Sequence, residues 1–526
     1  MTGFVSRRFF GLLVSLLAAV FSASTAQAET WHRADSHHFT IYSNGSANQL
    51  DEFAHELEKF DALLRMLFNR PVKENPTKLS IYLLRNGNDV EEFSPGAVGF
   101  YSVRLGQTYA VANRERGASK TNMDGKLVLF HEYAHHFMFH NFAIPAPAWF
   151  IEGFAEYVST ADFKSNGEWT FGFPAHHRAW SVQNGPSIPI ERLLSDDYSK
   201  MDSAQTASFY GWAWALTHML YSDPDMRGRQ ISAYLNDINS GMDSISAARK
   251  NFGDLKELDK NLARYVRRSM GYTKSDKPIP YRDDITVTTL DDEASDLRGL
   301  ILERLASREP EKVRSKLTRL ASETGSAAAW LELAELEFQL AHRTENSEGG
   351  YDFVATETAL NRSMAIDATL PRAHVLKGRL LLEPFDHNDN PDEANWAKAR
   401  AHFVAANRLD STDPLALYLF AQTYQRSGER GDMVEYALVD AFKYRPESTE
   451  FRSALAMFYA NEQRYDIAIA LLKIIANNPH SDNKSAKEAI ARLEDARDNG
   501  AALPIDAIAL ESEEDEDESG VTPTPN

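Results

Sequence analysis

An H-E-x-x-H sequence at residues 131–135 has the residue types and the spacing of a metal site. Residues i and i+4 lie on one face of a helix, so His131 and His135 can direct two imidazoles at one ion. Glu132 stands next to that face and can reach a water molecule on the ion. Catalytic zinc takes three protein ligands and keeps a fourth position open for water, so the two histidines leave the site one ligand short. The best candidate for the third ligand is Glu152, which follows after a short loop.

The histidines belong to a segment that should form a buried helix. Residues 126–144 contain neither Gly nor Pro, and apolar side chains surround the expected helix almost completely. Thr121 and Asp124 could form a capping box at its start, and Pro145 and Pro147 end it. Unpaired charge inside such a helix is costly, and a metal ion would satisfy it. The alternative is a buried polar cluster that holds no metal.

Two motifs carry a resemblance to a known family. They are H-E-x-x-H at 131–135 and W-x-x-E-G-x-A-E-Y at 149–157, in the next expected helix. Together they resemble the gluzincin zinc metallopeptidases of the thermolysin-like superfamily. The likeness is closer still to the bacterial peptidase MA-like group, in which this domain is often fused to tetratricopeptide repeats. The resemblance extends over about residues 31–268 and implies an α+β zinc domain. It also implies that Glu152 is the third ligand and that Glu156 orients the first histidine.

The same resemblance implies zinc-dependent hydrolysis of a peptide bond. Zn²⁺ would lower the pKa of a bound water, and Glu132 would act as the general base. Gluzincins commonly stabilise the oxyanion with a Tyr hydroxyl or a His imidazole. In the resembling group a Tyr opens the helix that matches residues 208–220, so Tyr210 is the candidate here. The alternative for Tyr210 is a side chain packed at a helix start.

Three other histidines are interpreted as structural. His218, two turns beyond Tyr210, is more typical of a core histidine with satisfied nitrogens than of a catalytic one. His136 is rotated off the face that the two candidate ligands share. His140 lies near the helix end, where a cation is favourable.

Residues 30–115 read as strands alternating with a helix. We expect strands at 38–42 and 79–84, a helix at 47–68, and two strands at 98–103 and 108–111 joined through Leu105-Gly106-Gln107. In gluzincins an edge strand lies beside the zinc cleft, where a substrate peptide can add as a further strand. The last two strands are the candidate for that edge, and a plain core strand pair is the alternative.

Composition limits the classes of function. The chain has 526 residues, a formal net charge of −20 and no cysteine. The negative charge argues against nucleic acid as a partner, since phosphate binding needs clustered Lys and Arg. Without cysteine, disulfides, thiolate zinc sites and cysteine nucleophiles are excluded.

The amino terminus predicts export. Arg7 and Arg8 precede an apolar run, and Ala26-Gln27-Ala28 matches a cleavage site, so residues 1–28 read as a signal peptide. The paired arginines also resemble a twin-arginine signal, although Gly11 and Leu12 depart from that pattern, and ordinary Sec export is the alternative. The run is too short to span a membrane, and no other run is long enough. The mature protein should be exported without a membrane span, and periplasmic if the source is Gram-negative.

The rest of the chain predicts a second, all-α domain. Residues 29–273 form the expected metallopeptidase domain, and the polar segment 274–293 is interpreted as a linker. In 294–500, A-x-x-Y sequences recur 35 residues apart, which fits a helix-turn-helix repeat of about 34 residues. The segment resembles degenerate tetratricopeptide repeats, whose concave surface usually binds a protein. A helical cap that stiffens the enzyme is the alternative. Residues 501–526 carry a run of acids and should be disordered.

Two functions remain open from the sequence. The first is an exported zinc metalloendopeptidase-like hydrolase that acts on a peptide or protein, with a cell-wall peptide as a narrower case. The second is a non-catalytic exported scaffold, in which the repeats bind partners and the zinc domain is degenerate. All positions of both motifs are intact, which favours the enzyme.

Overall fold

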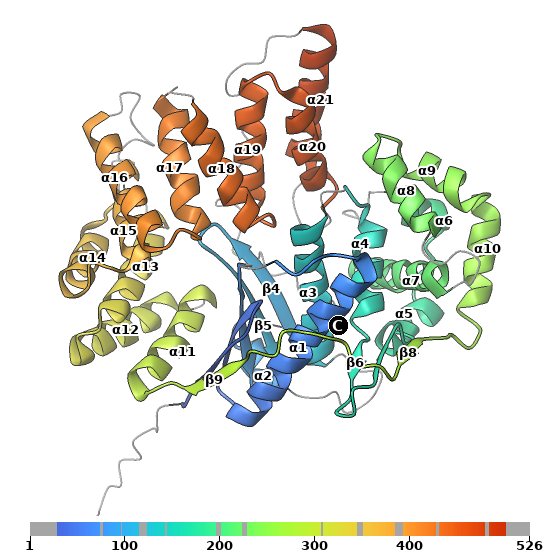
Figure 1. The fold of residues 1–526 in the computed structure, drawn as a ribbon, viewed down its shortest axis with the longest axis horizontal. Helices are drawn as coiled ribbons and strands as arrows, with labels where there is room; N and C mark the ends of the chain where they lie inside the picture. The colour runs from blue at the N-terminus through green and yellow to red at the C-terminus, as the bar shows by residue number, and fades with distance from the viewer. Residues whose placement is uncertain are drawn as a thin grey trace, which may run out of the picture.

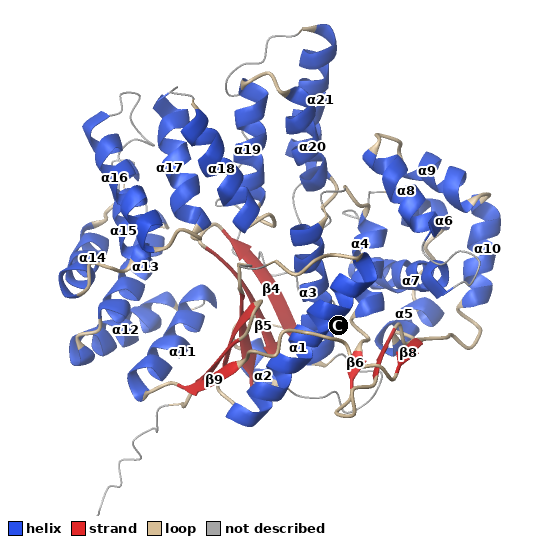
Figure 2. Ribbon diagram, in the orientation of Figure 1, coloured by secondary structure: helices blue, strands red, loops and turns tan. Residues whose placement is uncertain are grey.

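A computed structural model describes most of the chain and shows a small sheet region followed by helical repeats (Figures 1 and 2). The described residues are 29–73, 77–95, 97–114, 124–142, 145–195, 201–222, 229–306, 309–343, 351–383, 393–427, 431–478 and 483–500. The predicted signal peptide and acidic tail lie outside these ranges. Within them, no helix is long and apolar enough to cross a membrane.

The central sheet has six strands in the order β4-β5-β3-β2-β1-β9. Their bounds are β1 His32–Asp35, β2 Phe39–Ser43, β3 Leu79–Leu84, β4 Gly99–Arg104, β5 Gln107–Asn113 and β9 Thr286–Thr289. β2, β3 and β5 are parallel, whereas β4 pairs antiparallel with β5, and β1 pairs antiparallel with β2 and β9. The predicted hairpin is therefore confirmed as β4 and β5, and β4 is an edge strand of this sheet.

Ten α-helices accompany the sheet in the described residues before β9. They are α1 Ala47–Phe68, α2 Gly87–Glu91, α3 Gly125–Asn141, α4 Ala148–Val158, α5 Ala179–Asn184, α6 Ile190–Leu194, α7 Ser203–Ser222, α8 Arg229–Asn239, α9 Ser244–Phe252 and α10 Leu255–Tyr265. A second, three-stranded sheet is made of β6 Asp162–Phe163, β7 Trp169–Phe171 and β8 Thr273–Ser275.

Local sequence explains where the main helices begin and end. The Ser46 hydroxyl caps α1 by accepting from the Gln49 amide, and Asn69 ends the helix in the left-handed region. The carboxylate of Asp124 accepts from the Leu127 amide, so Asp124 is itself the N-cap of α3. The capping box was expected to start at Thr121, which lies outside the described residues.

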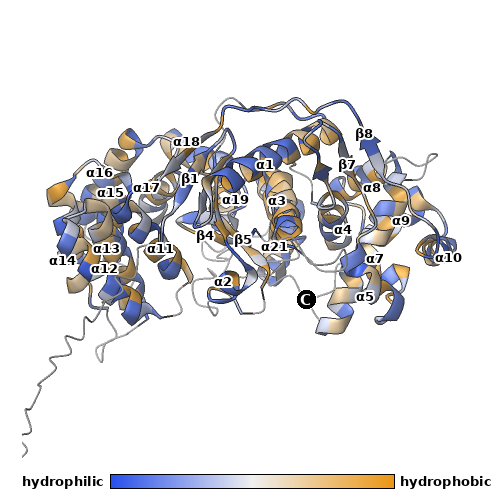
Figure 3. Ribbon diagram, turned by 90° about the horizontal axis from the view of Figure 1, so that it is seen from below, coloured by the Kyte–Doolittle hydropathy of each residue, from blue (hydrophilic) through white to orange (hydrophobic). Residues whose placement is uncertain are grey.

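The two faces of the central sheet are buried against different helices. One face packs against α1 and α3 in the largest hydrophobic cluster of the described chain, which includes Phe60 stacked on Phe130 at 4.1 Å between ring centroids. The other face buries Trp31 and Tyr82 against α11 (Asp292–Ala306) through Ile301. Figure 3 shows α3 in apolar colours near the middle of the molecule, as its nearly continuous apolar sequence predicts.

The segment predicted as a linker takes part in the first domain. β9 pairs along its length with β1, from His32 opposite Thr289 to Asp35 opposite Thr286. In addition, the Trp31 amide donates to the Ser295 hydroxyl at 3.1 Å. The segment is polar because β9 is a mostly exposed edge strand. Threonine suits such a strand, since it combines a β-branched side chain with a polar group.

The remaining helices form antiparallel pairs. They are α12 Pro310–Thr324, α13 Ala327–His342, α14 Val354–Ile366, α15 Pro371–Leu382, α16 Glu393–Leu409, α17 Pro414–Ser427, α18 Asp432–Tyr444, α19 Thr449–Asn461, α20 Tyr465–Ala476 and α21 Asn483–Asn499. The starts of α17, α19 and α21 are 35 and 34 residues apart, which matches the predicted period. The array arches from β9 over the β4–β5 turn to the end of α3 (Figure 1). Leu105 of that turn packs with Leu415 and Leu419 of α17.

Candidate metal centre

Two helices bring the three predicted ligands together. α3 carries His131 and His135 one turn apart, and α4 presents Glu152 from the opposite side. The Nε2 atoms of the two histidines lie 3.0 Å apart. The Oε2 atom of Glu152 lies 3.4 Å from Nε2 of His131 and 3.6 Å from Nε2 of His135.

This donor set fits a zinc ion. Bonds of 2.0–2.1 Å at tetrahedral angles separate ligand atoms by about 3.3 Å, close to all three distances. The three residues are almost fully buried, at 1% (His131), 3% (His135) and 0% (Glu152) exposure. Two imidazoles and one carboxylate are the ligand types that catalytic zinc uses. His131, His135 and Glu152 could therefore hold Zn²⁺.

Glu156 lies behind the first histidine and is held by two further side chains. Its Oε1 atom is 3.5 Å from Nδ1 of His131 and accepts from the Nε atom of Arg178 at 2.9 Å. Its Oε2 atom accepts from Nε2 of His177 at 2.7 Å. Burial raises the pKa of Glu156, but Arg178, His177 and His131 outweigh it and hold the pKa well below its usual range. The carboxylate is therefore ionised and can orient His131.

Sequence reasoning missed His177 and Arg178. Both lie in a single 3₁₀ turn, His176–Arg178, 21 and 22 residues beyond Glu156. No helical or strand periodicity connects such positions. The run of basic residues at 176–178 was the available signal, and it reads equally well as an exposed loop.

Glu132 is available for chemistry beside the three ligands. Its side chain keeps a small contact with solvent, at 7% exposure, and no hydrogen bond or ion pair to it is found among the described residues. It lies close enough to β4 to contribute to the raised pKa of Tyr101, after burial and Glu447.

Tyr210 also lies at the cluster. Its ring centroid is 6.3 Å from that of His131, and the guanidinium carbon of Arg178 is 5.0 Å from the Tyr210 ring centroid. The close approach of α4 and α7 depends on Gly153, because a Cβ there would clash with the Ala213 carbonyl and the Thr217 hydroxyl. The ring position places Tyr210 near the ligands, and its role in hydrolysis stays a prediction.

The histidines interpreted as structural differ in their surroundings. His218 matches its interpretation, with Nδ1 2.7 Å from the Tyr265 hydroxyl and Nε2 2.9 Å from the Gly172 carbonyl. Burial and the neighbouring His140 lower the pKa of His136 to about 3. His140 is not simply a cation at a helix end, because its Nε2 atom lies 2.7 Å from Oε2 of Glu447, 307 residues away in the repeats.

A largely apolar cavity of about 250 Å³ opens beside the candidate ligand His135. Its walls include Phe139 of α3, Phe150 of α4 and Leu235 of α8. Ile474 of α20 also lines it, so the repeats contribute to this cavity.

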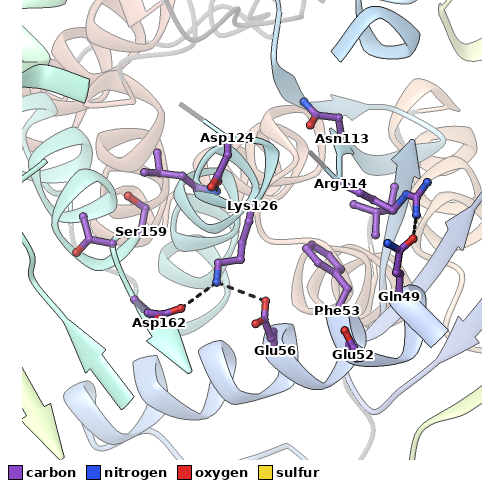
Figure 4. Close-up of a pocket in the computed structure, with 14 residues that line it drawn as sticks. Gln49, Glu52, Phe53, Glu56, Asn113, Arg114, Asp124, Lys126, Ser159 and Asp162 are labelled. Carbon is purple, nitrogen blue, oxygen red and sulfur yellow. Dashed lines mark hydrogen bonds and ion pairs between the residues drawn. The ribbon is translucent and has the colours of Figure 1, made fainter. Parts of the chain in front are cut away.

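A larger cavity, of about 450 Å³, lies at the other end of α3 and contains none of the candidate ligands (Figure 4). Part of its charge is paired, because the Lys126 ammonium lies 3.4 Å from both Glu56 and Asp162. Figure 4 shows these two pairs and, on the other side of the cavity, Arg114 bonded to Gln49.

Comparisons with known proteins add little to this geometry. No protein-family model and no curated protein matches the chain. Among solved structures, a thermophilic TPR protein from Thermus thermophilus is similar to 38% of this chain and to 98% of its own length, with 18% identity and a TM-score of 0.30. The helical repeats are identified by the pairing of α12 to α21, and no function follows from this likeness.

Proposed function

We propose that the chain is an exported zinc-dependent metallopeptidase that hydrolyses peptide bonds. The observation that carries the proposal is the buried grouping of His131, His135 and Glu152 at ligand distances, with the Glu132 carboxylate beside it. The two motifs that resemble gluzincins supply these same side chains at the right spacing. A purely structural cluster would not require the Glu132 side chain to keep contact with solvent.

When bound, a zinc ion would supply Lewis acidity toward a peptide carbonyl and would lower the pKa of water toward about 7. Glu132 accepts a proton from the attacking water and passes it to the leaving amine. Tyr210 donates a hydrogen bond to the oxygen on which negative charge develops. Glu156, fixed by Arg178 and His177, keeps the His131 ring in the orientation that a ligand needs.

The edge strand β4 supports a peptide or protein as substrate. An extended peptide can pair with a free strand edge through main-chain hydrogen bonds. Among the described residues β4 pairs with β5 alone, and its residue Tyr101 lies near Glu132. A peptide added to β4 would therefore run past the general base.

The apolar cavity beside His135 supports a substrate with an apolar side chain near the cleaved bond. Most of its lining residues are aromatic or aliphatic, and burying such a side chain there removes it from water. The repeats are proposed to bind a protein partner or the substrate, and the predicted signal peptide supports a periplasmic location.

The variant Glu132→Gln tests this function. It should keep the zinc ion, because Glu132 is not a ligand, and lose hydrolysis of a fluorogenic peptide library. The matched control is Glu56→Gln, which removes a carboxylate from the cavity at the far end of α3 and should leave both properties unchanged. Cleavage by Glu132→Gln at the wild-type rate would rule out the assigned base. If the wild type binds zinc and cleaves no peptide, the chain is the non-catalytic scaffold.

A further inference from the structure

A second cluster of metal-binding side chains lies where the repeats meet α3. It consists of His136 and His140 of α3 and Glu447, which follows α18. One nitrogen of each histidine and one oxygen of Glu447 lie within 4.8 Å of one another. Like the candidate catalytic ligands, the histidines are one helical turn apart and the third group is a carboxylate.

The two histidine pairs cannot share one ion. A shift of five residues along a helix turns the side chains by about 140° and moves them about 7.5 Å along the axis. His131 and His135 therefore face α4, whereas His136 and His140 face β4 and the repeats. The Tyr101 hydroxyl of β4 lies 2.9 Å from Nδ1 of His136.

The contacts of the second cluster suit a cation. The Tyr101 oxygen can accept the Nδ1 proton of His136, which leaves Nε2 with its lone pair for a ligand bond, as metal-binding histidines usually require. The Glu447 side chain is 3% exposed, and its Oε2 atom lies 2.7 Å from Nε2 of His140.

Two of the neighbouring cations are held by other groups, while Lys73 and Arg65 line the cavity that leads to the cluster. Arg445 donates to the Leu105 carbonyl at 3.3 Å, and Lys443 is paired with Asp440 at 3.6 Å and largely exposed. A cavity of about 210 Å³ reaches both histidines, so an ion has a path to the site.

We propose that His136, His140 and Glu447 form a second site for a divalent transition-metal ion, with zinc as the probe, that fastens the repeats to α3. Two imidazoles and a carboxylate suit zinc or a similar first-row ion. The ion takes the place of the direct contact between His140 and Glu447 and adds His136 as a ligand. The site is structural, because Tyr101, α3 and the repeats surround it, and it does not depend on peptide hydrolysis.

Metal content of the full mature chain tests the proposal. After dialysis against buffered Zn²⁺, the wild type should contain about two zinc ions per chain and Glu447→Gln about one. The matched control is Glu383→Gln, because Glu383 pairs with His342 at 2.9 Å with no third ligand among the described residues. That variant should keep both ions.

This experiment tests the two metal sites independently of each other. Glu152→Ala should remove the ion at the candidate catalytic site and leave the one at Glu447. A wild type with one ion, which Glu152→Ala removes and Glu447→Gln keeps, would overturn the second site without affecting the proposed peptidase.

A measurement on folded protein covers the case in which Glu447→Gln does not fold. Competition with a chromogenic chelator should show two classes of zinc site in the wild type. Tyr101→Phe, which removes the partner of His136, should weaken one class about 10–100-fold. The control Tyr109→Phe changes the neighbouring strand, where the hydroxyl contacts the Leu305 carbonyl, and should weaken neither. A single class of site, unchanged in Tyr101→Phe, contradicts the proposal.

Discussion

The Oε1 atom of Glu156 lies 3.5 Å from Nδ1 of His131, on the side of the ring away from the candidate metal position. The same oxygen accepts from Arg178, so a buried cation holds the carboxylate that lies against the candidate ligand His131. This order of contacts makes the position of His131 depend on a residue 47 places further along the chain.

Replacing Glu156 with Gln should weaken zinc binding without removing a ligand. The amide carries no charge to favour the correct form of His131, and changes of this kind typically cost 10–100-fold in metal affinity. Chelator competition measures the effect. Glu332→Gln is the control, since it also replaces a buried, ion-paired carboxylate but lies in the repeats, and its zinc affinity should equal that of the wild type. If Glu156→Gln and Glu332→Gln bind zinc with the same affinity, Glu156 does not contribute to the zinc site.

Tyr210→Phe should lower kcat about 10²–10³-fold and leave the zinc content unchanged. Loss of one donor to a developing oxyanion has this magnitude. Peptide hydrolysis and metal analysis on the same sample separate the two effects. Tyr234→Phe serves as the control, because it removes another buried hydroxyl in this domain, one that bonds Trp149 and Ser244. An unchanged kcat would leave Tyr210 as a packing residue.

Gly153→Ala should destabilise the fold and disturb the zinc site together. The added Cβ would meet the Ala213 carbonyl and the Thr217 hydroxyl, so α4 and α7 must separate. Overpacking of this kind costs about 1–3 kcal/mol in the free energy of unfolding. Separation of α4 from α7 also moves the neighbouring Glu152. Urea unfolding measures the loss of stability, and chelator competition measures zinc affinity. The control Gly271→Ala, which has open space at its Cβ position, should change neither. Wild-type behaviour of Gly153→Ala would show that the helices do not need this contact.

The buried carboxylate of Glu332 should make the repeats sensitive to acid. Burial raises its pKa, but Arg372 and Arg304 outweigh it and lower the pKa from 4.5 to about 2. Because the pKa is lower in the folded state, the ionised group stabilises the fold above about pH 4.5, and this contribution is lost as the pH falls toward 2. The shift corresponds to about 3 kcal/mol at neutral pH.

The difference in unfolding free energy between wild type and Glu332→Gln isolates this contribution. Measured in urea, the difference should be largest near pH 7 and should shrink steadily between pH 4.5 and 2. A difference that stays constant over this range would mean that Glu332 does not titrate with the fold.

Contacts close in sequence could be predicted, because helix and strand periods determine them. The spacing of His131 and His135 is enough to place both on one face of α3, and the apolar sequence around them is enough to bury that helix. The turn at residues 105–107 likewise predicted the pairing of β4 with β5.

Contacts between distant segments could not be predicted in this way. Arg178 reaches Glu156 from a short turn, and Glu447 reaches His140 across 307 residues. Each depends on how whole helices pack, which a single sequence does not reveal. The strand β9 was missed for a related reason: its exposed threonines have the composition of a loop.

The pairing of β1 with β9 has a consequence for the order in which the protein can mature. β1 is the first strand of the described residues, and it pairs at once with β2, but its second partner β9 is made about 257 residues later. Until β9 arrives, β1 has one exposed edge and Trp31 lacks its contacts with α11. The central sheet of the first domain therefore cannot be completed until the chain has been made as far as β9, at the start of the repeats.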